Sequence, residues 1–268
     1  MAPYTQAPQK TPLIHQELTD VIDLSLWAAQ MLTQHGADNA RIEETAHIIG
    51  TGLGCDWLDI VISPESIIIT ASSGGEFRTK ARRVISVGVN FNVLDAINEI
   101  SYRVRAGRMD RVTVREELTR ISQMVPTYNR WLVVVMVGLA CAALARLFGG
   151  DAPAMLVTLG AASVAMFVRQ EITRRHFNMY LMVLVTALVA VLIASLASLL
   201  HLGATPDAAL AASVLLVVPG VPLINAAEDL LNGYVLSGMA RGMAGALVTL
   251  AIALSLALGI YLTGIDGL

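Results

Sequence analysis

Charged residues are scarce in this chain. Asp, Glu, Lys and Arg make up 15% of its 268 residues, whereas soluble proteins average about 25%. The scarcity is concentrated after residue 130, where only 5 of the 18 Lys and Arg and 6 of the 21 Asp and Glu occur. The formal net charge is -3, so the basic surface typical of nucleic-acid-binding proteins is missing. We therefore expect no nucleic-acid partner, and we expect the second half of the chain to lie in lipid.

Cysteine is nearly absent, and the patterns that bind cofactors are missing. Cys55 and Cys141 are isolated, which predicts two reduced thiols and argues against a disulfide framework or a zinc site. The five histidines are scattered and show no metal-ligand spacing. Thr51–Gly54 is interpreted as a helix end rather than a phosphate-binding loop. We expect no cofactor and no enzymatic activity, and proton coupling is left open.

Long apolar stretches dominate residues 129–268. A helix needs roughly 20 residues to cross a bilayer. Four stretches are interpreted as crossings: Trp131–Phe148, Pro153–Val168, Asn178–Leu200 and Met239–Thr263. A fifth, Pro206–Leu231, is interrupted at Pro219–Pro222, where two prolines remove helix hydrogen bonds. We interpret it as one broken crossing, because bare backbone groups survive in a bilayer only where protein or water satisfies them.

The charges near these stretches predict their orientation. Seven arginines lie between Arg103 and Arg130, just before the first crossing. The connections then alternate, with Arg169, Arg174, Arg175 and Arg241 on one side and Asp151 and Asp207 on the other. Arg146 is the exception and is expected to snorkel to the outer interface. The positive-inside rule then predicts a cytoplasmic N-terminus and an external C-terminus. We expect a multi-pass protein of the inner membrane.

Residues 1–128 have the composition of a globular domain. We expect a disordered N-terminal tail without a cleaved signal peptide, because the first residues contain no apolar core. The periodicity predicts helices over Leu13–His35, from Asp38 as N-cap to 52–54, and over Asn92–Ala106 and Thr113–Met124, with strands over Asp56–Ser63, Ser66–Ala71 and Phe77–Val84. The predicted fold is an α-helical membrane protein with about five transmembrane helices, one broken, and an N-terminal cytoplasmic α+β domain.

A polar stripe follows the break. If Pro222 opens a helix, Asn225, Glu228, Asp229 and Asn232 fall on one face of it. Together with Pro219, Gly220, Pro222 and Arg241 they form our candidate substrate-binding or translocation site, since acids within a membrane are costly unless they function. The alternative is an amphipathic helix over 222–236 at the inner surface, with solvated acids. Arg241 either pairs with an acid or marks the inside edge.

Two segments carry a family resemblance. The string from Pro219 to Gly242 (PGVPLIN, DLLNG, SG and RG) resembles the hallmark segment of the threonine/serine exporter family, and Gly36–Glu43 (GADNARIE) is similar to its Gly-x-x-x-x-Arg-hydrophobic-Glu motif, which marks Gly36, Arg41 and Glu43. The resemblance covers essentially the whole chain. It implies export of small carboxylate-bearing metabolites: threonine and serine in long members, or dicarboxylates such as succinate in a two-protein form.

The chain departs from the long members because it stops at Leu268, before a second membrane half. The resemblance therefore implies a two-component transporter with a small membrane-protein partner, and small residues in the helices favour oligomerisation. A membrane-anchored sensor or assembly protein is the alternative function. A membrane enzyme is weaker, because no nucleophile, metal set or cofactor motif accompanies the two acids.

The orientation can be tested with reporter fusions at residues 150, 172, 203 and 268. We expect the reporters to lie outside, inside, outside and outside, because the arginine asymmetry places the N-terminus in the cytoplasm. A C-terminus on the inside would contradict the broken crossing and leave four spans, with 205–236 at the inner surface.

Overall fold

The computed structural model describes residues 11–85, 88–123 and 128–265, so most of the predicted disordered tail lies outside the described residues. Two compact units are present. The first comprises Met1–Val125 and Val221–Gly242, and the second comprises Pro126–Gly220 and Met243–Leu268. The predicted division into domains 1–128 and 129–268 stays a prediction. The segment Val221–Gly242 belongs to the first unit, which a linear division does not foresee.

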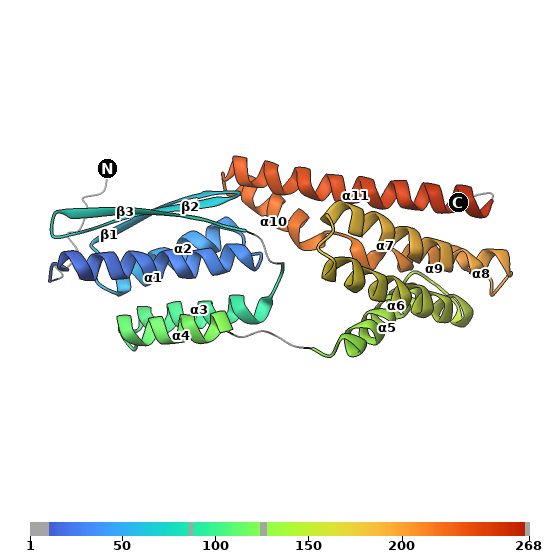
Figure 1. Cartoon of the computed structure of the whole chain (residues 1–268), viewed down its shortest axis with the longest axis horizontal. Coiled ribbons are helices and arrows are strands. Elements are labelled where there is room, and N and C mark those ends of the chain that lie inside the picture. The colour runs from blue at the N-terminus through green and yellow to red at the C-terminus, as the bar shows by residue number, and fades with distance from the viewer. Residues whose placement is uncertain (1–10, 86–87, 124–127, 266–268) are drawn as a thin grey trace. The chain divides into compact units, whose positions relative to one another are not determined.

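The first unit begins with helices and a three-stranded sheet (Figure 1). Its elements are α1 (His15–Gln34), α2 (Asn39–Gly52), β1 (Trp57–Ser63), β2 (Ser66–Ser73), β3 (Glu76–Arg83), α3 (Phe91–Arg105) and α4 (Arg111–Gln123). The strands are antiparallel in the order β1-β2-β3. The predicted α+β character is confirmed, and most boundaries differ by one or two residues.

The sheet and α1 form one hydrophobic core. Ile67, Ile69 and Ala71 alternate along β2 with more exposed neighbours, and all three are fully buried. This period of two is the signature of a strand with one buried face. α1 packs against β2 and β3 and buries Leu18, Ile22 and other apolar side chains at helical spacing. α2 packs against α1, β1 and α3, so this core also fixes the position of α2.

The chain enters α2 through a tight turn. Gly36 has a φ of +87°, a left-handed conformation that favours glycine, and its missing Cβ would lie 3.0 Å from the Val89 side chain. Asp38 is the N-cap, as predicted, and its carboxylate accepts a hydrogen bond of 2.9 Å from the Arg41 backbone N–H. The turn and the cap together set the direction of the first turn of α2.

Two further helices complete the first unit. α10 (Gly220–Leu231) is followed by a turn at Gly233, whose φ is +87°, and by the start of α11 (Val235–Thr263). The two helices pack closely at Gly238, where a Cβ would lie 2.7 Å from Leu230 Cγ and 3.0 Å from the Ala226 carbonyl oxygen. Gly238 therefore permits close helix packing within the chain.

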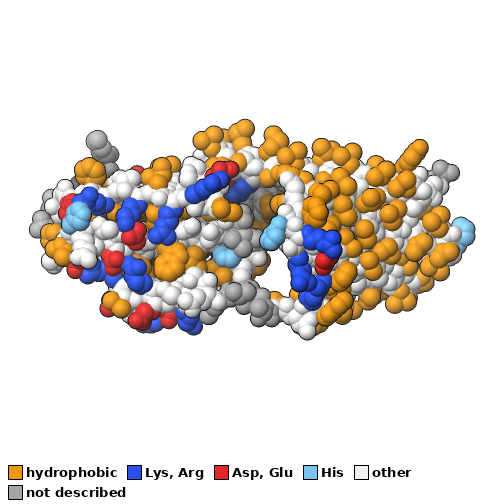
Figure 2. Space-filling view, in the orientation of Figure 1, with side chains coloured by type: hydrophobic (Ala, Val, Ile, Leu, Met, Phe, Trp, Pro, Cys, Tyr) orange, Lys and Arg blue, Asp and Glu red, His pale blue; other side chains and the backbone are white. Residues whose placement is uncertain are grey.

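The second unit is a helical bundle with a core of small residues. It contains α5 (Arg130–Leu147), α6 (Ala152–Arg174), α7 (Met179–Ala194), α8 (Leu196–Leu199), α9 (Pro206–Ser213), the 3-10 turn η1 (Leu215–Val217) and the rest of α11. Ala161, Ala187 and Val191 are among its buried side chains. Such small residues let helices approach closely without a hydrophobic driving force. Figure 2 shows hydrophobic side chains over the visible face of these helices.

The four uninterrupted crossings are confirmed within the described part of the chain. Arg130–Leu147, Ala152–Arg174, Met179–Leu199 and Val235–Thr263 are long and apolar enough to span a bilayer. Pro206–Val217 and Gly220–Leu231 form a bent pair that makes a fifth span if counted as one. α6 continues past the predicted end at Val168, because the polar residues that follow extend its last turns without breaking its hydrogen bonds. α11 likewise begins at Val235 rather than Met239.

The close contact at Gly238 predicts a specific loss of stability. Gly238→Ala would press its methyl group against Leu230 and Ala226, and overpacking of this kind costs about 1–3 kcal/mol. Gly242→Ala is the matched control, because its Cβ would meet only Ala226 Cβ at an ordinary 3.8 Å. In thermal unfolding of the purified proteins, we expect Gly238→Ala to have a lower Tm than the wild type. Gly242→Ala should have an unchanged or higher Tm. Equal Tm values would contradict the packing described.

Candidate functional site

At the helix break, a side chain of the second unit satisfies a backbone carbonyl. η1 ends at Val217, and Val218 is extended before Pro219. The Leu216 carbonyl at this point accepts a hydrogen bond of 3.1 Å from Arg169 Nη1 on α6. A carbonyl at the end of an interrupted helix lacks an intrahelical donor, so the guanidinium supplies one. Pro219 is buried and Gly220 is exposed.

The predicted polar stripe divides into two pairs. Within the first unit, Asn225 contacts the turn before α2, and Asp229 contacts the first residue of α2 and is only 1% exposed. Glu228 and Asn232 are exposed and line a cavity instead. A surface helix with two solvated acids therefore describes Glu228 but not Asp229.

The Asp229 carboxylate binds the N-terminus of α2, a contact called here the closure of α2. One oxygen, Oδ1, accepts a hydrogen bond of 2.9 Å from the backbone N–H of Asn39, the first residue of that helix. The other, Oδ2, lies 3.2 Å from Arg241 Nη1, while Arg241 Nη2 donates to the side-chain oxygen of Asn39 at 3.3 Å. A carboxylate at a helix N-terminus interacts favourably with the helix dipole. Arg241 was predicted either to pair with an acid or to mark the inside edge, and in the structure it pairs with Asp229.

Two more hydrogen bonds connect the same segments. Asn225 Nδ2 donates to the Gly36 carbonyl at 2.7 Å, and the Tyr234 hydroxyl donates to the Glu43 carboxylate. Burial, together with that neighbouring carboxylate, raises the pKa of Tyr234 above its ordinary value, so the phenol stays protonated and donates. The bonds of Asn225, Asp229 and Tyr234 join residues 189, 190 and 191 positions apart.

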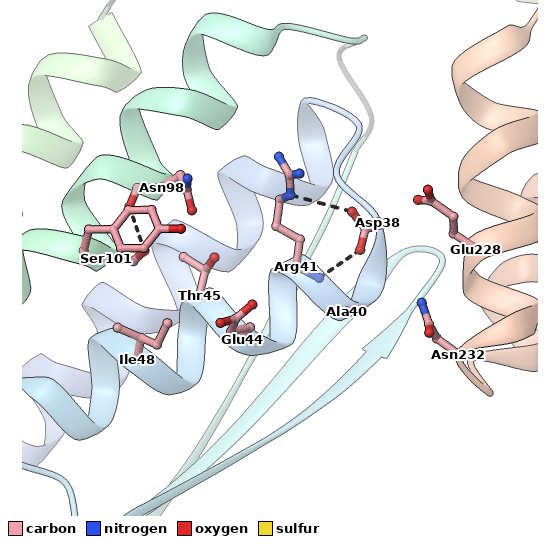
Figure 3. A pocket seen from close by; sticks show the side chains of 11 residues that line it. Asp38, Ala40, Arg41, Glu44, Thr45, Ile48, Asn98, Ser101, Glu228 and Asn232 are labelled. Atoms are coloured by element: carbon pink, nitrogen blue, oxygen red, sulfur yellow. Dashed lines mark hydrogen bonds and ion pairs between the residues drawn. The ribbon is translucent and has the colours of Figure 1, made fainter. Parts of the chain in front are cut away.

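A polar cavity of about 500 Å³ opens beside this cluster (Figure 3). Its lining includes Asp38, Arg41, Glu44, Thr45, Asn98, Ser101, Glu228 and Asn232, from α2, α3 and α10. Arg41 Nε lies 3.7 Å from the Asp38 carboxylate. Three carboxylates face one guanidinium here, so the cavity suits a ligand with an ammonium group or other donors better than a dianion.

The first unit thus brings together most of the predicted site residues. They are Gly36, Arg41, Glu43, Pro222, Asn225, Glu228, Asp229, Asn232 and Arg241, whereas Pro219 and Gly220 belong to the second unit. Three residues of these contacts, Asn39, Tyr234 and Arg169, are not among the predicted site residues. Asn39 and Tyr234 lie inside the two motif segments, whereas the sequence marks Arg169 only as an inside charge. Among the described residues, no group of three or more His, Cys, Asp or Glu side chains could hold a metal ion.

Comparison with known proteins identifies the family. Residues 23–263 match the family described as "Putative threonine/serine exporter". The chain belongs to the threonine/serine exporter family. It is therefore a multi-pass membrane protein of a transporter family rather than an enzyme.

Relatives of two lengths are known. The "Probable succinate transporter subunit YjjP" of Klebsiella aerogenes is 37% identical over 251 residues, which cover 92% of this chain and 95% of that protein. The protein of the same name from Escherichia coli (strain K12) is 35% identical, with 92% and 96% covered. The "Threonine/serine exporter" of Corynebacterium glutamicum is 22% identical over 272 residues, which cover 97% of this chain but 56% of that protein. No solved structure matches the chain.

The closure of α2 by Asp229 predicts strong coupling with Arg241. Asp229→Ala leaves the Asn39 N–H and the Arg241 guanidinium without their acceptor, and breaking a buried ion pair costs about 3–5 kcal/mol. The double variant with Arg241→Ala should lose about 0.5–3 kcal/mol less than the sum of the single losses. Chemical unfolding of the purified protein measures both. Glu228→Ala is the exposed control and should change the free energy of unfolding by no more than about 0.5 kcal/mol. Additive losses would contradict the coupling.

Proposed function

We propose that this chain is one subunit of an exporter that carries small dicarboxylates such as succinate out of the cytoplasm across the inner membrane. The near full-length similarity to two relatives named as succinate transporter subunits supports this substrate over threonine or serine. The similarity to the longer threonine/serine exporter covers only part of that protein. The cytoplasmic N-terminus and external C-terminus predicted above belong to the same proposal.

The proposal includes a partner protein that supplies further membrane helices. The described residues hold four spans, or five with the bent pair, and a bundle of this size offers few faces for enclosing a path. Gly160 on α6 leaves room for close helix contact, because nothing lies within 4 Å of a Cβ built there. A small membrane protein, a second copy of this chain, or both would cover such faces.

The observation that carries the proposal is the interrupted helix pair with the polar segment that follows it. A membrane anchor needs no broken span, whereas transporters place substrate sites at discontinuous helices. We propose that Pro219, Gly220 and Pro222 form the hinge of this segment. Asn225, Asp229 and Arg241 hold it in the state described, and Glu228 and Asn232 remain open to solute.

A sensor is the second candidate function. The polar cavity beside Arg41 could bind a ligand in the first unit without any transport. Its three carboxylates disfavour a dicarboxylate, so a sensor built on it would respond to a cationic or zwitterionic ligand.

Export assays separate these functions. In the source organism with its gene deleted, succinate in the medium should fall and should return when wild-type protein is supplied. Asn225→Ala and Asp229→Asn should each lower export by up to about tenfold, because each removes an interaction that holds α10 against the Gly36–Asn39 segment, and a lost hydrogen bond costs about 0.5–1.5 kcal/mol. Asp229→Asn keeps an acceptor for the Asn39 N–H but removes the charge that pairs with Arg241.

Glu116→Gln on the exposed surface of α4 is the matched control and should export normally. Protein abundance in the membrane is measured for every variant. Full export by both site variants at normal abundance would remove the stripe from the mechanism. Loss of threonine export with unchanged succinate export on deletion would contradict the dicarboxylate assignment.

A further inference from the structure

A dicarboxylate exporter needs a positive charge along its path, and the following inference rests on the proposed function. The cavity of the first unit offers a poor site, because Asp38, Glu44 and Glu228 outnumber Arg41. The Lys and Arg side chains of the second unit are five arginines: Arg130, Arg146, Arg169, Arg174 and Arg175. Their surroundings decide which of them is available to an anion.

Four of the five arginines make no hydrogen bond to the described residues at the helix break. Arg130 lies over the rings of Trp131 and Phe167, at 5.4 and 5.1 Å from their centroids, and pairs with Glu171 at 3.9 Å. Arg175 pairs with the same Glu171 at 3.3 Å. Arg146 donates to the Gly150 carbonyl beyond its own helix end, and Arg174 is exposed in the last turn of α6.

Arg169 differs from all of them. It lies within α6, is partly buried, and pairs with no carboxylate among the described residues. A buried guanidinium without a counter-ion is costly, and ionisable residues inside a membrane segment generally mark a functional site. A snorkelling arginine would extend its charged group to water. Arg169 instead donates to the Leu216 carbonyl, next to the break.

The guanidinium has a free edge in this position. Nη1 is occupied by the Leu216 carbonyl at 3.1 Å. Nε and Nη2 make no hydrogen bond to any residue that the structure describes, and the residue is only partly buried. These two N–H groups form the planar fork that binds a carboxylate through two parallel hydrogen bonds.

We propose that Arg169 binds one carboxylate of the transported dicarboxylate at the helix break. The substrate carboxylate then serves as the counter-ion of the guanidinium, while Nη1 keeps its hydrogen bond to the Leu216 carbonyl. Because one guanidinium holds both the substrate and the last turn before the break, binding acts directly on the interrupted helix. Arg169 is then a substrate-binding residue of the second unit, separate from the polar stripe on α10.

The competing possibility is that Arg169 only supports the Leu216 carbonyl. Inside-out membrane vesicles from the source organism distinguish the two, because they retain any native partner. The chromosomal gene is deleted, variants are expressed in its place, and the uptake of radiolabelled succinate is measured over a range of concentrations. Arg169→Gln keeps a donor for Leu216 but removes the charge, Arg169→Lys keeps the charge but loses the fork, and Arg174→Gln is the matched control on the same helix.

We expect Arg169→Gln to raise the KM for succinate at least about tenfold, with Vmax and abundance close to wild type. Arg169→Lys should raise KM by a smaller factor, and Arg174→Gln should leave it unchanged. An unchanged KM in Arg169→Gln overturns the inference. If that variant is missing from the membrane, Arg169→Lys decides, and an unchanged KM there overturns the inference in the same way. Wild-type vesicles without gene-dependent succinate uptake would instead overturn the proposed function, and the inference with it.

Discussion

The first unit depends on how the N-terminus of α2 is satisfied. Asp38 caps the helix from the preceding residue, and Asp229 accepts the N–H of Asn39 from a helix 190 positions later in the chain. The first N–H groups of any helix lack intrahelical acceptors, and a buried unsatisfied group costs about 1–3 kcal/mol. Arg241 neutralises the buried carboxylate. These contacts hold α10 and the start of α11 against the N-terminus of α2.

The helix end at the break in the second unit also needs a hydrogen-bond partner, but there the unsatisfied group is an acceptor rather than a donor. There the interrupted helix exposes a carbonyl at Leu216, and a guanidinium from α6 satisfies it. A carboxylate of the Pro219–Gly242 segment thus satisfies the helix end in the Gly36–Glu43 segment, and a guanidinium satisfies the helix end just before Pro219. Irregular backbone at such points is tolerated in a membrane protein only when side chains or water complete its hydrogen bonds.

Packing in the two units follows different physics. The first unit buries large aliphatic side chains of α1 and β2 against each other, where the hydrophobic effect stabilises them. The bundle of the second unit buries mostly alanine and valine, and its larger apolar side chains, such as Leu156 and Met136, are exposed. Lipid makes that arrangement favourable, because the exposed side chains leave water and the small residues allow close backbone contact.

Most of the fold could be predicted from the sequence because its signals are local. Apolar runs, the alternation along β2, the Asp38 cap and the two prolines at the break each act within a few residues, and the structure places helices, strands and the interruption where they indicate. Charge scarcity indicated the membrane half, and the motif strings indicated the transporter family.

The partners of the polar residues could not be predicted from such local signals. Helical spacing put Asn225, Glu228, Asp229 and Asn232 on one face, but only the tertiary structure turned Asp229 to the N-terminus of α2 and left Glu228 exposed. Only the tertiary structure, likewise, placed the Arg169 guanidinium beside the Leu216 carbonyl. Hydrogen bonds between residues far apart in sequence depend on where packing brings the helices, and no local pattern encodes that distance.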